Sequence, residues 1–131
     1  MDEAAIVRHL LDKLPGALAV YLFGSRAAGE AGAASDLDIA VLVEGRVDPL
    51  ALWETANALS GIVGCHVDLV DLRTASTVMQ HQIVVRGRRL WSLDARAGIY
   101  EAFILSEKLE LDAARGALLA DIAREGKVHG R

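Results

Sequence analysis

Two apolar runs joined by a link of small residues constrain the fold of this chain more than any other feature. The first run ends at Gly24-Ser25, and the second opens with Asp36-Leu37-Asp38 and continues to Val43. Side chains alternate along a strand, so Asp36 and Asp38 are expected on one face with Cα atoms about 6.6 Å apart. Two carboxylates this close repel each other unless a cation lies between them, and Mg²⁺ prefers oxygen ligands. The pattern therefore predicts a divalent metal site at the start of the second strand.

Gly24-Ser25 predicts a phosphate-binding bend beside that metal site. Glycine lets a backbone approach a ligand closely. Free N–H groups at the start of a short helix from Ser25 to Ala28 could face an anion. Arg26 follows the pair and is either a phosphate contact or an exposed arginine at a helix start. The simpler interpretation of the whole stretch is a tight turn before an exposed acidic strand.

A third carboxylate, Asp68, lies in a later apolar run and is either a site residue or an exposed residue on an edge strand. A lone carboxylate there is costly unless it is paired or near a metal. Asp71 falls on the opposite face by the period of two, so it is predicted as a cap or turn residue. Zinc needs three or four ligands, and no others cluster near Cys65-His66. We therefore expect Cys65 to be a small buried residue and His66 an ordinary surface residue.

The spacing of these motifs resembles the signature of the nucleotidyltransferase superfamily that includes DNA polymerase β and kanamycin nucleotidyltransferase. That signature is Gly-Ser, ten residues, then Asp-x-Asp, and here ten residues separate Gly24-Ser25 from Asp36-Leu37-Asp38. The family also carries a third acidic residue on a later strand, which would be Asp68. A Walker phosphate loop is a poorer match, because Glu30 stands where its lysine should be.

Composition indicates one compact domain in a reducing compartment. The chain has 131 residues, of which 53% are hydrophobic, and no apolar run approaches the ~20 residues that span a bilayer. The start Met-Asp-Glu shows no signal peptide, and the single Cys65 excludes an internal disulfide, so a cytoplasmic protein is expected. The net charge of −4 argues against broad, non-specific binding of nucleic acid. A local basic cluster is either a solvated turn or a contact for a triphosphate or an acidic partner: Arg86, Arg88 and Arg89.

Hydrophobic periodicity predicts an α/β (α+β) fold, a small mixed sheet flanked by helices with a long C-terminal helix. The nucleotidyltransferase core is expected over 1–93, with 94–131 as a helical extension of the same domain. The helices are predicted over 2–14, 50–59, from Thr74 or Ser76 to about 85, and 94–125, and the strands over 17–23, 36–44, 62–72 and 88–91.

The last of these helices is too long for the body of the domain. Unbroken over 94–125 it would measure about 48 Å, whereas a domain of this size has a radius of gyration of about 14 Å. It must either break, for instance near Gly116, or extend beyond the body. An apolar helix that extends beyond the body usually binds a partner protein. The alternative is a bent helix that wraps round the core of its own domain.

Taken as a whole, the chain resembles the minimal nucleotidyltransferase (MNT) antitoxins, which are encoded beside HEPN ribonuclease toxins. The segments 67–78 and 87–91 and the long C-terminal helix look like that group. The resemblance implies transfer of AMP from ATP to a tyrosine of the toxin, with the toxin bound through the C-terminal helix and the active-site face. It also implies that Asp36, Asp38 and Asp68 hold one or two Mg²⁺ ions and that Gly24, Ser25 and Arg26 bind the nucleotide.

Two other functions stay open from the residues alone. An antitoxin could neutralise its partner by contact, without catalysis. The chain could instead modify a small hydroxyl compound such as an antibiotic, although 131 residues leave little room for a second, substrate-enclosing domain. Binding of membranes or direct binding of nucleic acid is not expected.

Overall fold

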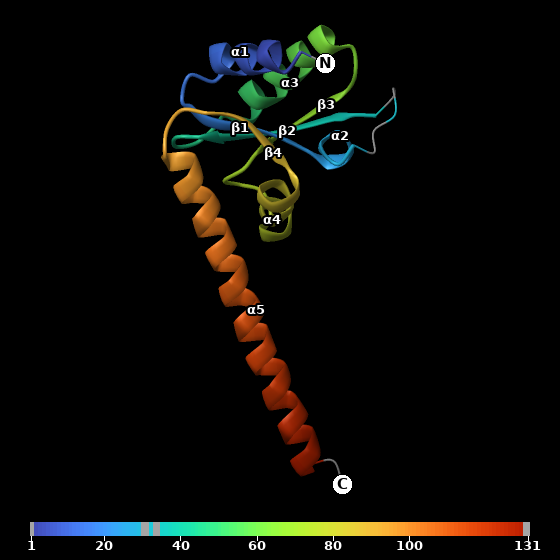
Figure 1. The fold of residues 1–131 in the computed structure, drawn as a ribbon, viewed down its shortest axis with the longest axis vertical. Coiled ribbons are helices and arrows are strands. Elements are labelled where there is room, and N and C mark those ends of the chain that lie inside the picture. The colour runs from blue at the N-terminus through green and yellow to red at the C-terminus, as the bar shows by residue number, and fades with distance from the viewer. Residues whose placement is uncertain (1, 30–31, 33–34, 130–131) are drawn as a thin grey trace.

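A computed structural model describes residues 2–29, 32 and 35–129, with side chains described as far as Arg124. Figure 1 shows helices on both sides of a sheet and the last helix projecting far from the body. In chain order the elements are α1 Glu3–Lys13, β1 Ala17–Phe23, α2 Gly24–Ala27, β2 Leu37–Val43, α3 Pro49–Val63, β3 Val67–Asp71, α4 Thr77–Arg86, β4 Arg88–Ser92 and α5 Arg96–His129.

The strands form one mixed sheet in the order β3-β2-β1-β4. β1 pairs antiparallel with both β2 and β4, whereas β2 and β3 run parallel. β1 and β2 are therefore central, and both are buried along nearly their whole length. The predicted class, a small mixed sheet flanked by helices with a long C-terminal helix, is confirmed.

Each face of the sheet carries its own hydrophobic core. On one face α1 and α3 cover the strands, and on the other face α4 and the first turns of α5 do so (Figure 1). Alternation assigns Leu37, Ile39 and Val41 of β2 to the first core, and Ala40 and Leu42 to the second. Asp38 therefore points to the face that α4 and α5 cover.

Capping side chains mark the starts of three helices. Asp2 accepts a hydrogen bond from the backbone N–H of Ala5, and Ser76 accepts one from Met79. Asp48 caps α3 directly before a proline at the first helical position. These side chains satisfy N–H groups that have no partner inside the helix.

The end of α3 and the start of β3 differ from the prediction. The helix was expected to stop at Ser60-Gly61 and the strand to begin at Ile62, but α3 continues to Val63 and β3 spans only Val67–Asp71. Gly64 ends the helix, with a φ of 77° and its N–H donating to the carbonyl of Ser60 at 2.9 Å. A left-handed residue of this kind is the usual glycine helix stop, and Gly61 simply remains within the last turn.

α5 is one unbroken helix, so the predicted alternative of a break near Gly116 is wrong. It continues to His129, past the predicted end at residue 125. Ala97 and Ile104 are buried against the sheet, but every described side chain from Leu109 to Arg124 is exposed. Among the described side chains, none packs against this helix beyond its first turns, so no described contact would force a bend. Among the described residues, no helix is both long and apolar enough to cross a bilayer.

Candidate active site

Asp38 and Asp68 face each other across the parallel pair of strands. They are register partners in β2 and β3, and side chains of partners in a parallel pair project from the same face. Asp36 lies two residues before Asp38 and so shares that side. The structure thus brings the three predicted carboxylates together on the face of the sheet that α4 covers. Asp71, on the other hand, is buried and accepts the N–H of Arg73 at 3.0 Å, the turn role predicted for it.

Partial burial raises the pKa of Asp38 above its ordinary value of 3.8, and the neighbouring carboxylates raise it further. Burial is the largest cause, followed by the charges of Asp68 and Asp36. His66 acts in the opposite direction. An ionised Asp38 is therefore destabilised as it stands, and a cation bound among the carboxylates would relieve that repulsion.

His66 belongs to this cluster, which the sequence did not reveal. Its side chain is exposed, as predicted, but Nε2 lies 3.5 Å from Oδ1 of Asp68. One ligand atom each from Asp36, His66 and Asp68 lies within 4.8 Å of the others. The available signal was its position two residues before Asp68, where alternation puts both on one side. The donor set, carboxylate oxygens with one imidazole at the edge, fits a hard divalent cation.

Gly24 lies so close to the carboxylate of Asp38 that any side chain at this position would displace that carboxylate. Its φ is 72°, and a Cβ built on it would lie 2.1 Å from Oδ2 of Asp38. β1 ends at Phe23, so this contact holds the Gly24-Ser25 bend directly over the start of β2. Ser25 follows in the short helix α2. The predicted phosphate bend and the predicted metal carboxylates are thus adjacent.

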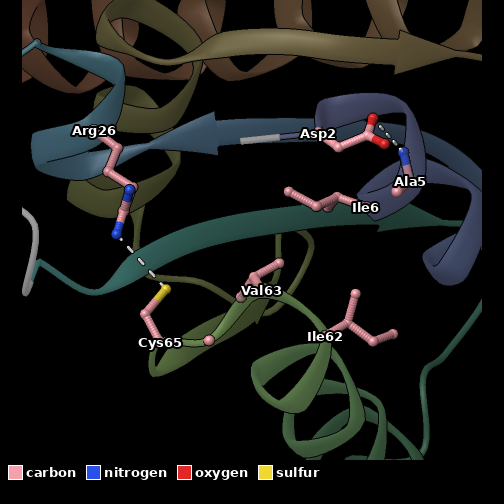
Figure 2. Close-up of a pocket in the computed structure, with 8 residues that line it drawn as sticks. Asp2, Ala5, Ile6, Arg26, Ile62, Val63 and Cys65 are labelled. Atoms are coloured by element: carbon pink, nitrogen blue, oxygen red, sulfur yellow. Dashed lines mark hydrogen bonds between the residues drawn. The ribbon is translucent and has the colours of Figure 1, made fainter.

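Arg26 holds the backbone of the acidic segment in place through hydrogen bonds. Its guanidinium donates to the backbone carbonyls of Ser35 at 2.7 Å and Asp36 at 3.3 Å. A third contact, at 3.6 Å, reaches the sulfur of Cys65 (Figure 2). These bonds hold the backbone of Asp36 and the segment before β3. Cys65 was expected to be buried, but its side chain is half-buried. Contact of Arg26 with phosphate stays a prediction.

Behind these contacts a cavity of about 400 Å³ opens between α1 and the end of α3. Figure 2 shows Ile6, Val63 and Cys65 around it, with the side chain of Arg26 crossing toward the cysteine. Ile6 and Val63 belong to the first core, so the cavity lies on the face of the sheet away from Asp38. It is separate from the carboxylate cluster.

The three arginines near the end of α4 have different surroundings. Arg88 makes two hydrogen bonds with Glu3, at 2.8 and 3.0 Å, and Arg89 pairs with Glu101 at 2.8 Å. Arg86 lines a second cavity together with the Gly24-Ser25 bend. The predicted basic cluster is thus divided between two structural ion pairs and one residue beside the candidate site.

The chain matches a known protein family over most of its length. Residues 6–96 match the family described as polymerase beta, nucleotidyltransferase. Over 122 residues the chain is 38% identical to a curated protein, "Protein adenylyltransferase MntA" of Shewanella oneidensis, covering 93% of this chain and 88% of that protein.

Solved structures extend the likeness over the long helix. A chain of a crystal structure described as a toxin–antitoxin with AMP-PNP superposes with a TM-score of 0.82 at 38% identity, covering 93% of this chain and 98% of that one. A chain from a tri-AMPylated Shewanella oneidensis HEPN toxin in complex with MNT antitoxin gives a TM-score of 0.75 at 37% identity, with 92% and 94% covered.

Proposed function

We propose that this chain, which belongs to the polymerase beta nucleotidyltransferase family, is a protein adenylyltransferase antitoxin. It transfers AMP from ATP to a tyrosine hydroxyl of a HEPN toxin and so neutralises the toxin. The similarity to MntA over nearly the full length supports the reaction class. The similarity to an antitoxin in complex with a tri-AMPylated HEPN toxin supports the choice of substrate.

The observation that carries the proposal is the convergence of Asp36, Asp38 and Asp68 beside the Gly24-Ser25 bend. The three carboxylates would hold one or two Mg²⁺ ions, with His66 at the edge of the set. When bound, Mg²⁺ neutralises charge on the phosphates and aligns the attacking and leaving oxygens. Ser25 and the backbone N–H groups beside it orient the β- and γ-phosphates, and Arg26 holds the segment that carries Asp36.

Asp68 is the carboxylate best placed to meet the incoming hydroxyl. It lies on the edge strand β3 and its side chain is exposed, whereas Asp38 is partly covered beneath Gly24. A tyrosine hydroxyl has an ordinary pKa of about 10, so at neutral pH it must lose its proton to a positioned base as it attacks. Asp68 accepts that proton or serves as a further metal ligand.

α5 supplies the surface for the toxin. The helix leaves the sheet on the face that carries the carboxylates, at the end of the sheet away from α2, and projects from the body, so a toxin bound along it would lie on that face (Figure 1). Isolated apolar side chains are normal on a surface, but an apolar series along one unpacked helix marks a protein interface. The exposed members are Ile99, Phe103, Leu105, Leu109, Leu111, Leu118, Leu119 and Ile122.

The same surface favours a second function, neutralisation by binding alone. The two functions separate in one experiment with Mg-ATP and a HEPN toxin as the partner. Wild-type protein should add one or more AMP units to the partner in an intact-mass measurement. The Asp36→Asn, Asp38→Asn double variant should co-purify with the partner and add none. If the double variant still protects cells from the toxin, contact suffices and the proposed role of catalysis is wrong.

A further inference from the structure

We propose that Arg86, with Gln82 one turn before it on α4, binds the terminal phosphates of the nucleotide and offsets the charge of the departing pyrophosphate. This inference rests on the proposed AMP transfer from ATP. It assigns to α4 a direct part in the site, beyond covering one face of the sheet.

The first support is the shape of the surface between α4 and the Gly24-Ser25 bend. A cavity of about 280 Å³ lies there, lined by Phe23, Gly24, Ser25, Ala28, Gln82 and Arg86. Gln82 and Arg86 are four residues apart and so lie on the same side of α4. Because α4 packs on the face to which Asp38 points, the cavity and the carboxylates are on one side of the sheet.

Gly87 holds this end of α4 directly against β1. Its N–H donates to the carbonyl of Ile83 at 3.0 Å, and a Cβ built on it would lie 2.9 Å from the carbonyl oxygen of Leu22. Leu22 precedes Gly24 by only two residues. The backbone contact therefore fixes the distance between Arg86 and the phosphate bend, without any bond from the arginine side chain itself.

The charge of Arg86 is available to a ligand. Arg88 and Arg89 are already paired with Glu3 and Glu101. Arg86 is exposed, and none of the described carboxylates lies within ion-pair distance of it. An arginine guanidinium presents two parallel N–H donors that match two phosphate oxygens, and the amide of Gln82 adds a neutral donor.

The reaction places its charge where this arginine lies. The tyrosine oxygen forms a bond to the α-phosphorus, and the bond from that phosphorus to the oxygen bridging to the β-phosphate breaks. The tyrosine proton passes to Asp68, and pyrophosphate leaves with the electron pair. The α-phosphate must sit by the carboxylates for this step, so the β- and γ-phosphates extend past Ser25 toward Arg86.

Calorimetric titration with AMP-PNP and Mg²⁺, and separately with AMP, tests the assignment without partner protein or turnover. Arg86→Gln should weaken AMP-PNP binding about 10- to 100-fold, the usual value of a hydrogen-bonded charge, and leave AMP binding unchanged. Arg86→Lys should fall between, because it keeps the charge and loses the paired donors. Arg46→Gln is the matched control, an exposed arginine in the turn between β2 and α3.

Each possible outcome of the titrations bears on the proposed role of Arg86. Equal affinity of Arg86→Gln and wild type for AMP-PNP would overturn it, and so would an equal loss for AMP-PNP and AMP, which would indicate a structural effect. Wild-type protein that binds AMP-PNP tightly through Arg86 but modifies no toxin would overturn the proposed function alone. Wild-type protein that binds no nucleotide would overturn both.

Discussion

Asp38 and Asp68 lie directly opposite each other on neighbouring parallel strands, and both project from the face of the sheet covered by α4. A parallel pairing of two acidic residues is unfavourable for the fold, because like charges directly opposite repel. Partial burial and, after it, this repulsion raise the pKa of Asp38. The protein thus keeps an arrangement that costs stability and that a divalent cation would relieve.

Replacing Asp38 by Asn should stabilise the metal-free protein while abolishing AMP transfer. A carboxyl with a raised folded-state pKa adds stability below its unfolded pKa, near 3.8, and that stability is lost as the pH rises through the folded value. The gain at pH 7 should be at most about 1 kcal/mol, because solvent screens a partly exposed group. Thermal melts in EDTA at pH 7 and near pH 4 check this, and the difference between the proteins should shrink at the lower pH. A variant that melts below wild type at pH 7 would contradict the repulsion.

Gly24→Ala should remove activity through a collision with the carboxylate of Asp38. The added Cβ would lie 2.1 Å from Oδ2 at a φ of 72°, so Asp38 must move. Gly45→Ala is a matched control, since its φ is 79° with no atom within 4 Å of a Cβ. Both variants should lose about 1 kcal/mol of unfolding free energy for the left-handed backbone. Only Gly24→Ala should lose AMP transfer, and similar activity in the two variants would contradict the role of the contact.

Tyr21→Phe should loosen the attachment of α5 to the sheet. Tyr21 is buried in β1 and donates from its hydroxyl to Glu101 of α5 at 2.9 Å, and Arg89 of β4 holds the same carboxylate oxygen. Burial and the bond to Glu101 raise the pKa of Tyr21, so its hydroxyl stays a donor at any pH where the protein is used. Loss of a hydrogen bond to a charged group should reduce the unfolding free energy by about 1.5–3 kcal/mol in urea titrations.

Tyr100→Phe provides the comparison for that measurement, because Tyr100 contacts Phe103 and Arg73 through its ring. Its unfolding free energy should stay within about 0.5 kcal/mol of wild type. Equal losses in the two variants would mean that the bond from Tyr21 to Glu101 is not what attaches α5.

Leu118→Glu should weaken toxin binding without affecting the fold. Leu111, Leu118 and Ile122 are exposed at helical spacings of seven and four, so they share a side of α5. A charge at the centre of an apolar interface should reduce affinity about 30-fold or more, whereas an exposed substitution leaves stability nearly unchanged. Leu50→Glu, at an equally exposed leucine near the start of α3, should bind the toxin normally in a pull-down titration. Normal binding by Leu118→Glu would remove this side of α5 from the interface.

Local patterns predicted most of the elements, because each depends on neighbours in the chain. The bounds Ala17–Phe23 of β1 followed directly from an apolar run, and the start of α4 after Ser76 was one of the two starts predicted. The end of α3 did not follow in this way, since a glycine inside a helix and a glycine that ends one look alike until the φ of Gly64 is known.

The site was only partly predictable, because some of its contacts depend on segments that are distant in the sequence. Asp36 and Asp38 share a face by period alone, but the approach of Asp68 depends on parallel pairing between strands separated by a helix. Likewise, the division of the arginines depends on where Glu3 and Glu101 lie, both distant in sequence. Alternation along the predicted strand 62–72 already put His66 on the side of Asp68, but their approach to 3.5 Å and the nearness of Asp36 depend on the paired strands.

The most direct measurement of the central claim is the initial rate of AMP transfer from Mg-ATP to the HEPN partner by Asp68→Asn, beside the exposed control Asp12→Asn on α1. If the three carboxylates act together, Asp68→Asn should reduce the rate about 10²- to 10⁴-fold while Asp12→Asn matches wild type. An Asp68→Asn rate within about threefold of wild type, far smaller than the loss of a base produces, would contradict the account.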